Sequence, residues 1–390
     1  RSKNQRLLLL GLFFLLSELI RSELLFDFPW GLVSSIWINT PIAQGLALFG
    51  PYWLSGFTIF SAFFLSRPWV GSLASLTIIV ALYGFGLHRL NLPLEERYEP
   101  IKVRIIQPNI EQSEKWKPEL AANFLNKQLE MSRSAKVRGV DLIVWPETAV
   151  SYGVQKQQKL RSIIADDLGA PLLLGARRFD DNTKKLYNSA FLLGSNGDIL
   201  GVYDKNKLVP FGEYIPFAQF LSQMAIPGLA SDGLTGFSPG KKEGILRINE
   251  VGIFKILICY EAIFSDEKRR SSERPSWIVH ITNDAWFGSF NGPQQHLALV
   301  QMRAIEHGLP IVRAANTGIS AIIGPYGRIQ AKLSLGISGS LDAFLPRALK
   351  PTIYLYLGAT LCNTFLICGL MLTIFILVII KSRNRFVDYK

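Results

Sequence analysis

Cysteine, histidine and, over long stretches, any charged residue are scarce in this sequence. The chain of 390 residues has three cysteines and four histidines, and 18% of its residues are charged. Three cysteines cannot form a disulfide framework, and no cluster of cysteines and histidines has the spacing of metal ligands. We therefore expect neither a disulfide scaffold nor a bound metal, and we expect no other cofactor.

Charge is missing above all from two stretches. From Trp30 to Leu87 the only charged residue is Arg67, and from Pro351 to Ile380 there is none. A core helix of a soluble protein keeps a polar face, whereas a helix that crosses a bilayer needs about 20 mainly apolar residues. The stretches therefore predict membrane crossings at about Leu7–Ile20, Ala43–Ser66 and Val70–Leu87, and a last one over 351–381.

The composition divides the chain into three parts. Residues 1–90 hold the first three predicted crossings and 351–381 the last, while 100–348 have the composition of a globular domain. Basic residues precede the first crossing, occur at Arg67 and follow the last, which favours the cytoplasmic side for these positions. The globular domain is then expected on the opposite side, although His88 and Arg89 count weakly against this.

The net charge of +12 could indicate a nucleic-acid partner. No basic stripe interleaved with aromatic residues supports that interpretation. We attribute the charge to membrane topology and to affinity for anionic head groups.

The globular part alternates short apolar runs with amphipathic stretches, which is typical of a layered α/β domain. Helical patterns fall at about 117–137, 155–168 and 293–308, and a hairpin turn is expected at Ser195–Asp198. Strands are predicted at 103–107, 141–146, 171–176, 189–194, 254–260, 277–282, 310–315 and 320–324.

Polar side chains of chemical interest stand at the ends of apolar runs and in one loop. They are Glu147 after the run 141–146, Lys205, Lys207 and Glu213 around a Pro/Gly turn, and Cys259 at the end of the run 254–260. Each has an ordinary alternative when taken alone: an acid near a helix N-terminus, a solvated loop and an inert core thiol.

Together, a carboxylate, a lysine and a thiol supply what nucleophilic attack on an acyl group requires. The thiolate is the nucleophile, and the carboxylate can accept the thiol proton. A lysine can stabilise the oxyanion, and one such donor lowers the barrier by about 3 kcal/mol. A histidine is the usual partner of a catalytic cysteine, but none of the four histidines stands in a context like that of a papain-type partner. They are His88, His280, His296 and His307.

The same residues resemble a known superfamily. The motifs WPET (145–148), YDKNKLVPFGE (203–213) and ICYE (258–261), in this order, are similar to the Glu-Lys-Cys triad of the nitrilase/amidase superfamily. A narrower resemblance, over essentially the whole chain, is to the apolipoprotein N-acyltransferase family of bacterial envelopes. It is carried by FPWG (28–31), QPNIEQSEKW (107–116), LVPFGEYIP (208–216), ITNDAWFG (281–288) and QQHLALVQMRAIEHGLPIVRAANTGIS (294–320).

The resemblance implies an α/β fold, a four-layer α-β-β-α nitrilase-like sandwich attached to a transmembrane α-helical bundle. It implies Glu147 as the base, Lys205 as the triad lysine, with Lys207 as the less favoured choice, and Cys259 as the nucleophile. Glu213 would position the lysine. The resemblance also implies that three residues support the acyl site: Tyr260, Glu261 and Trp116.

The reaction implied is transfer of a fatty acyl chain from a membrane phospholipid to the α-amino group of the N-terminal diacylglyceryl-cysteine of bacterial lipoproteins, through a thioester on Cys259. The enzyme would be a monomer that spans the bacterial inner membrane several times, with its catalytic domain on the periplasmic side. Because the family has more crossings than we predict here, the chain is expected to begin inside the membrane domain.

Two other interpretations of function stay open. One is a membrane-anchored amidase or nitrilase that uses the same triad with water as acceptor. The other is a receptor that binds lipoproteins without acylating them. The apolar loop 213–237, with two prolines and three glycines, is further predicted to be a mobile arm that dips into lipid and gates the site, the alternative being a packed insertion.

Overall fold

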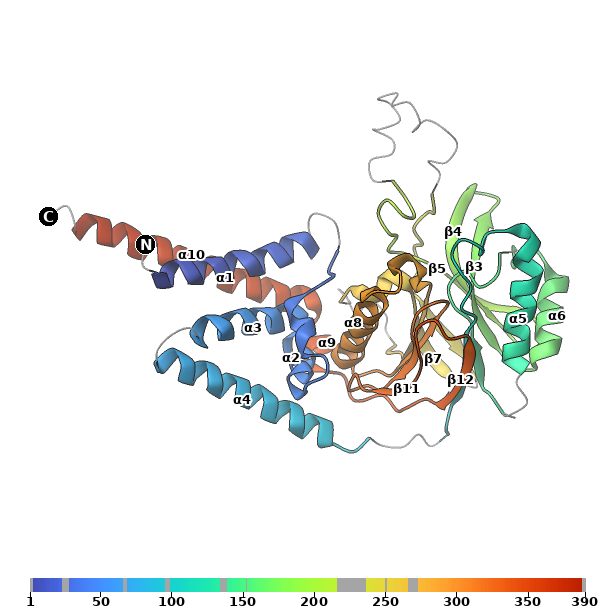
Figure 1. The fold of residues 1–390 in the computed structure, drawn as a ribbon, viewed down its shortest axis with the longest axis horizontal. Coiled ribbons are helices and arrows are strands. Elements are labelled where there is room, and N and C mark those ends of the chain that lie inside the picture. Colours follow the sequence, from blue (N-terminus) through green and yellow to red (C-terminus); the bar gives the residue numbers. More distant parts are fainter. Residues whose placement is uncertain are drawn as a thin grey trace, which may run out of the picture.

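A computed structural model of the chain describes residues 3–22, 28–65, 69–94, 99–133, 139–151, 153–215, 236–249, 251–265 and 273–387. In this part of the chain two six-stranded sheets form the globular part, and a group of helices extends from one side of it (Figure 1). Most of loop 213–237, the predicted arm, lies outside the described residues. Its described ends meet, because the Phe237 amide donates to the carbonyl of Glu213 at 2.8 Å.

Both sheets are mixed. The first has the strand order β12-β1-β2-β3-β4-β5 and the second the order β11-β10-β9-β8-β7-β6. In the first, β1, β2 and β3 pair in parallel, in the second β7, β8 and β9 do, and the other neighbours pair antiparallel. The strands of the first sheet are β1 (Lys102–Gln107), β2 (Leu142–Val144), β3 (Leu172–Asp180), β4 (Lys185–Leu193), β5 (Ile199–Asp204) and β12 (Gly339–Phe344). Those of the second are β6 (Ile245–Ile248), β7 (Gly252–Ile258), β8 (Trp277–Thr282), β9 (Ile311–Ala315), β10 (Ser320–Ile323) and β11 (Ile329–Leu333).

The two sheets face each other across the main hydrophobic core. In β7 the buried Phe254, Ile256 and Ile258 point into this core and alternate with less buried residues, as a strand with one core face does. The outer face of the first sheet is covered by α5 (Ala121–Arg133) and α6 (Gln158–Leu168), and that of the second by α8 (Gly292–His307). The layers follow as helix, sheet, sheet, helix (Figure 1), so the predicted α-β-β-α sandwich is confirmed.

The predicted elements of the globular part are present, and the additional ones lie at sheet edges. All eight predicted strands occur within a few residues of their predicted bounds, and the helical patterns form α5, α6 and α8. Strands β6, β11 and β12 have no counterpart in the sequence prediction. Each is the outermost strand of its sheet and is only partly buried, so it lacks a long apolar run.

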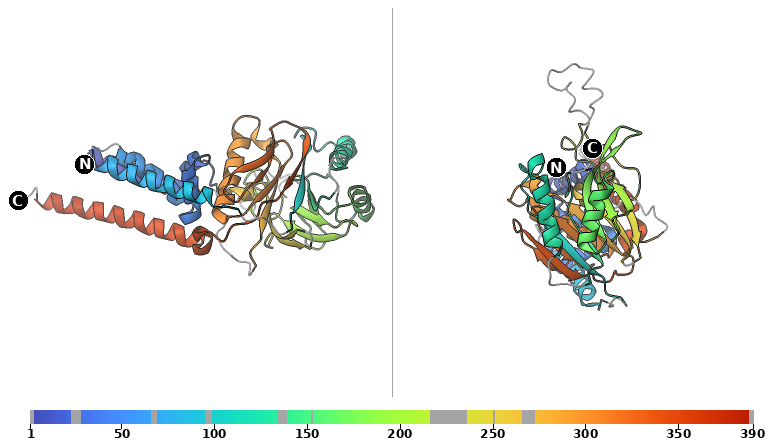
Figure 2. Two further views of the ribbon diagram at one scale, coloured as in Figure 1. Left: turned by 90° about the horizontal axis from the view of Figure 1, so that it is seen from below. Right: turned by 90° about the vertical axis from the view of Figure 1, so that its right-hand side faces the viewer.

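The helices outside the sandwich run side by side away from it (Figure 2). They are α1 (Lys3–Ile20), α3 (Pro51–Leu65), α4 (Val70–Asn91) and α10 (Ala359–Val387). Among the described residues one stretch, Gly71–Asn91 of α4, is long and apolar enough to cross a membrane, while α3 and Ala359–Phe375 are apolar but shorter. The other crossings, and with them the transmembrane bundle, stay predictions.

Two predicted crossings are wrong in their bounds. The segment 43–66 is not one helix, because it comprises the end of η3 (Pro41–Gly45), α2 (Leu46–Phe49) and α3, with Gly50 at φ +85° before α3. The tail helix starts at Ala359 and not near 351, because α9 (Ile353–Leu357) ends at Gly358, whose φ is +82°. Glycine adopts such angles without a Cβ clash, which is why these helices end there.

Segment 41–49 joins the outer helices to the sandwich. Its side chains Ile42 and Leu46 pack with Leu299 and Met302 of α8 in one buried cluster. The exposed helices are therefore fixed to the helical layer that covers the second sheet.

Gly50 provides a test of this junction. A Cβ at this residue would lie 2.3 Å from Cε2 of Tyr354 in α9, and the backbone has φ +85°. We expect Gly50→Ala to cost at least about 1–3 kcal/mol, because only glycine accepts this conformation. The fall in Tm should be several degrees in detergent solution.

The control for Gly50→Ala is Gly84→Ala in α4, where a Cβ would meet no atom within 4 Å. Alanine favours a helix over glycine by about 1 kcal/mol, so this Tm should stay equal or rise. Equal Tm values for the two variants would show that the junction at Gly50 is not packed as described.

Candidate active site

Glu147, Lys205 and Cys259 each lie just beyond the carboxyl end of a strand. Glu147 follows β2, Lys205 follows β5 of the same sheet, and Cys259 follows β7 of the other sheet. All three side chains are buried. The two sheets thus bring the three predicted residues to one place, as α/β folds commonly do with the ends of their strands.

Lys205 lies between two carboxylates. Its Nζ is 3.5 Å from Oε1 of Glu147 and 2.9 Å from Oε2 of Glu213, and the lysine is 1% exposed. Burial acts to lower the pKa of Lys205, but the negative charges of Glu147 and Glu213, and of Cys259 whenever it is a thiolate, outweigh it and raise the pKa above its ordinary value. Lys205 is therefore an ammonium at neutral pH, and Glu213 contacts it.

Two asparagines that the sequence analysis does not single out order these carboxylates. Asn188 of β4 donates through Nδ2 to Oε1 of Glu147 at 2.7 Å and to Oε1 of Glu213 at 2.9 Å. The backbone amide of Asn283 donates to Oε2 of Glu147 at 2.9 Å. The only sequence signal for Asn188 is that an amide side chain interrupts the mainly apolar strand β4. Asn283 lies inside the motif ITNDAWFG.

Gly175 of β3 allows the Glu147 segment to lie close to the sheet. A Cβ there would be 2.5 Å from the nitrogen of Thr148 and 2.7 Å from Cα of Glu147. Thr148 itself has φ +47°, an angle that is costly for a branched residue. The close approach and the strained turn together aim Glu147 into the site.

Cys259 stands on a second strained turn. The strand predicted over 254–260 ends at Ile258, and Cys259 opens η6 (Cys259–Ile263) with φ +50°. Such an outlier is held only where the surroundings enforce it, and outliers of this kind cluster at active sites. Burial and the charge of Glu147 raise the pKa of the thiol to about 12, against the opposing effects of Lys205 and a hydrogen bond with Thr282. The resting residue is a protonated thiol.

Glu261 ties the loop that bears Lys205 to the strand that bears Cys259. Its carboxylate accepts from the amides of Asn206 at 2.7 Å and Ile258 at 2.8 Å, and from the hydroxyl of Tyr203 at 2.7 Å. Burial raises its pKa. The arrangement makes Glu261 a positioning residue that fixes the spacing between the two sheets at the site.

Lys207, the less favoured choice for the triad lysine, has different neighbours from Lys205. Nζ of Lys207 is 4.5 Å from the ring centroid of Phe264, whereas Nζ of Lys205 contacts Glu147. This geometry favours Lys205 as the triad lysine.

Tyr260 and Trp116 occupy the surroundings of the site. The Tyr260 ring stacks with Phe28 at 6.3 Å and meets Phe264 edge-on at 5.1 Å, so it faces the N-terminal segment. Trp116 is 42% exposed, and the guanidinium of Arg177 lies 4.4 Å from its ring centroid. Tyr260 is buried, whereas Trp116 is exposed.

A fully buried cluster of polar side chains contacts the backbone of Cys259. Arg313 donates from Nη1 to Nδ1 of His280 at 2.8 Å, so the proton of this imidazole is on Nε2, which donates to the carbonyl of Cys259 at 3.1 Å. Asp284 pairs with Arg313 and with Nδ1 of His296, the latter at 2.9 Å. Burial lowers the pKa of His280 and of His296, so both rings are neutral. His280 therefore holds the backbone carbonyl of Cys259.

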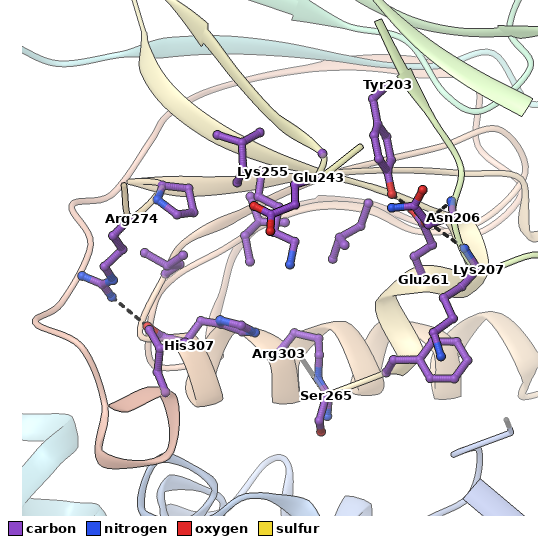
Figure 3. A pocket seen from close by; sticks show the side chains of 18 of the residues that line it. Tyr203, Asn206, Lys207, Glu243, Lys255, Glu261, Ser265, Arg274, Arg303 and His307 are labelled. Atoms are coloured by element: carbon purple, nitrogen blue, oxygen red, sulfur yellow. Dashed lines mark hydrogen bonds between the residues drawn. The ribbon is translucent and has the colours of Figure 1, made fainter. Parts of the chain in front are cut away.

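A cavity of about 580 Å³ lies beside the site (Figure 3). It is bounded by the outer face of β7, the end of α8 and α9, with Tyr203, Asn206 and Glu261 at one end. Glu147, Lys205 and Cys259 are not among its lining residues, so Glu261 separates it from the thiol. Several of its charged groups already have partners; Arg274, for example, donates to the carbonyls of Leu349 and His307.

Metal-ligating side chains do not gather anywhere in the described part of the chain: no group of three or more His, Cys, Asp or Glu residues there could hold an ion.

A buried thiol, a carboxylate and a lysine lie at the strand ends of the α-β-β-α sandwich, and this part of the chain belongs to the carbon-nitrogen hydrolase family. The carbon-nitrogen hydrolase family model matches residues 102–349. The chain is 36% identical over 386 residues to the apolipoprotein N-acyltransferase of Rhodopseudomonas palustris, covering 92% of this chain and 71% of that protein. It is 37% identical over 360 residues to that of Agrobacterium fabrum, covering 87% and 67%.

The chain belongs to the apolipoprotein N-acyltransferase family, and it is a membrane enzyme that transfers acyl groups. Among solved structures, a variant of the Nesterenkonia AN1 amidase from the nitrilase superfamily is similar to the sandwich. It has a TM-score of 0.46 and 18% identity, and the match covers 65% of this chain and 93% of that one.

Asn188→Asp tests whether the Asn188 amide orders the two carboxylates. The substitution replaces an N–H donor shared by Glu147 and Glu213 with a third negative charge. We expect formation of the acyl-enzyme to slow by about 100-fold, or about 2.7 kcal/mol of barrier. The rate can be measured in single turnovers by mass spectrometry.

The matched control is Asn182→Asp on the exposed β3–β4 turn, which should leave the rate unchanged. A rate for Asn188→Asp close to that of this control would mean that Asn188 has no part in ordering Glu147.

Proposed function

We propose that this enzyme moves a fatty acyl chain from a membrane phospholipid to the α-amino group of the N-terminal diacylglyceryl-cysteine of a lipoprotein, with Cys259 as the acyl carrier. The observation that carries the proposal is the buried Lys205, held between Glu147 and Glu213 and interacting electrostatically with Cys259. In this proposal Glu147 is the base and Lys205 stabilises the oxyanion.

The first half-reaction begins with a proton transfer inside the site. The pKa of the Cys259 thiol is raised to about 12, first by burial and then by the negative charge of Glu147. When Glu147 takes the thiol proton, its charge disappears and the thiolate is left beside the Lys205 ammonium. The thiolate then attacks the ester carbonyl of the phospholipid, and the lysophospholipid leaves with the proton from Glu147.

The second half-reaction uses the same groups in reverse order. The α-amine of the lipoprotein attacks the thioester carbonyl, and Glu147 accepts a proton from the amine nitrogen. The carbon–sulfur bond breaks, the amide is complete, and the proton on Glu147 returns to the Cys259 sulfur. Ping-pong kinetics follow from the covalent intermediate.

The substrates explain why such an enzyme stays at a membrane. Lifting one chain of about 16 carbons into water costs on the order of 12 kcal/mol, at about 0.8 kcal/mol per CH₂. Large apolar side chains are exposed on the helices outside the sandwich, among them Leu73 and Ile78 of α4 and Leu372 and Phe375 of α10. These exposed faces are suited to lipid.

We further propose that the enzyme is a monomer in the bacterial inner membrane, crosses it several times and holds its catalytic domain on the periplasmic side. The support for this orientation is the position of the basic residues before the first crossing, at Arg67 and after the last. The acceptor lipoprotein would then be met at the outer surface of this membrane.

Cys259→Ser tests the acyl carrier, with Cys368→Ser in α10 as a matched control because Cys368 is an exposed free cysteine. Incubation of the wild-type protein with phospholipid should add the mass of one fatty acyl group to the peptide that bears Cys259. A synthetic diacylglyceryl-cysteine peptide should remove it, and water should remove it far more slowly.

The Cys368→Ser protein should behave as the wild type, and Cys259→Ser should carry no acyl group. Normal amounts of acylated acceptor from Cys259→Ser would refute the proposal. Rapid loss of the acyl group to water alone would instead indicate an amidase or nitrilase, and absence of any thioester in the wild type would indicate a receptor.

A further inference from the structure

A second lysine is buried beside the site. Lys115, in the motif QPNIEQSEKW, is 4% exposed, and its Nζ donates to the backbone carbonyl of Glu147 at 3.0 Å. In the part of the chain that the structure describes, no carboxylate lies within ion-pair distance of this Nζ. A buried ammonium with only a neutral partner costs several kcal/mol, so its position calls for an explanation.

The lysine is placed there by a firmly held turn. The amide of Lys115 donates to the carbonyl of Glu111 at 3.1 Å, and the side chain of Gln112 accepts from Nδ2 of Asn283 at 2.7 Å. The amide of the same Asn283 donates to Glu147. Because one residue ties both the turn and the carboxylate, Lys115 keeps a fixed place relative to Glu147.

The surrounding negative charges compensate for this burial. Burial lowers the pKa of Lys115 to about 8, and the charges of Glu147 and Cys259 oppose this effect. The ammonium therefore persists at neutral pH because the site is anionic. Its charge acts on the thiolate and on the carboxylate that exchange the proton.

A count of charges shows what the second lysine changes. Glu147 and Glu213 pair with Lys205, so two carboxylates face one ammonium, and these three groups together have a net charge of −1 (two negative and one positive group). Transfer of the Cys259 proton to Glu147 moves this charge without changing it. The Lys115 ammonium offsets the charge of these three groups before and after the transfer, which matters most where the dielectric is low.

We propose that Lys115 is a second cation of the active site, which stabilises the Cys259 thiolate and positions Glu147 through its backbone carbonyl. The proposal rests on Cys259 being the nucleophile. It assigns a role to the turn after β1, which carries Lys115 directly before Trp116.

The test is the pH dependence of Cys259 alkylation by iodoacetamide, a small neutral reagent that reacts with the thiolate. Lys115→Met keeps the length of the side chain and removes the charge. We expect the alkylation rate of Cys259 at neutral pH to fall about 10-fold, and the difference from the wild type to disappear well above pH 8, where Lys115 of the wild type is itself neutral. Mass spectrometry of the Cys259 peptide gives the rate, with Cys368 as the internal reference.

Two further variants separate charge from structure. Lys117→Met removes an exposed lysine two residues along and should leave the profile unchanged. Lys115→Arg keeps the charge and should recover most of the rate. In the wild type, the assistance from Lys115 should be present below about pH 8 and be lost above it, as its ammonium deprotonates.

The outcomes are distinguishable. If Lys115→Met and Lys117→Met give the same alkylation profile, the inference about Lys115 fails while Cys259 remains the proposed nucleophile. If the wild-type Cys259 shows no acyl-enzyme at all, the proposed function fails first. If Lys115→Met does not fold, as judged by its Tm, Lys115→Arg decides: a 10-fold fall of its alkylation rate at neutral pH would refute a role for the charge.

Discussion

The site depends on one electrostatic constraint: a fully buried lysine that two carboxylates keep charged. At 1% exposure, the negative charges of Glu147 and Glu213 raise the pKa of Lys205 against the effect of burial. Burial, and then the charge of Glu147, raise the pKa of the neighbouring thiol, so that Cys259 is protonated at rest. In the proposed mechanism the activation of Cys259 is therefore a proton transfer inside the site.

Backbone strain fixes the geometry that this electrostatic balance requires. Thr148 and Cys259 both have positive φ angles, at the two turns that bring Glu147 and the thiol together. Gly175 leaves room beneath the first turn, and His280 holds the carbonyl of Cys259 at the second. Because Arg313 in turn holds His280, the buried cluster stabilises the strained backbone at Cys259. The cluster is thus part of the site although it contacts no substrate.

Much of this could be predicted from the sequence, and the rest could not for physical reasons. Apolar runs mark the central strands, so Glu147 and Cys259 stand out at the ends of two of them, whereas Lys205 is preferred to Lys207 only through the family resemblance. Edge strands such as β12 are half exposed and leave no such mark. Asn188 and Lys115 escape because their importance comes from what they contact across the fold, and a single polar residue in a strand or turn looks ordinary. The helix breaks at Gly50 and Gly358 escape because a glycine inside an apolar run does not reveal its φ angle.

The packing around the nucleophile connects it to the helical side of the molecule. Trp30 contacts the ring of His296 at 5.7 Å, and His296 joins Asp284, Arg313 and His280 in the cluster that ends at the Cys259 carbonyl. Phe28 stacks on Tyr260, the residue next to the nucleophile. Segment 28–31 therefore touches the site from two directions. The aromatic residues of this segment pack both against the residue after Cys259 and against the cluster that holds the Cys259 carbonyl. The geometry of Cys259 therefore depends on how the segment packs against the sandwich.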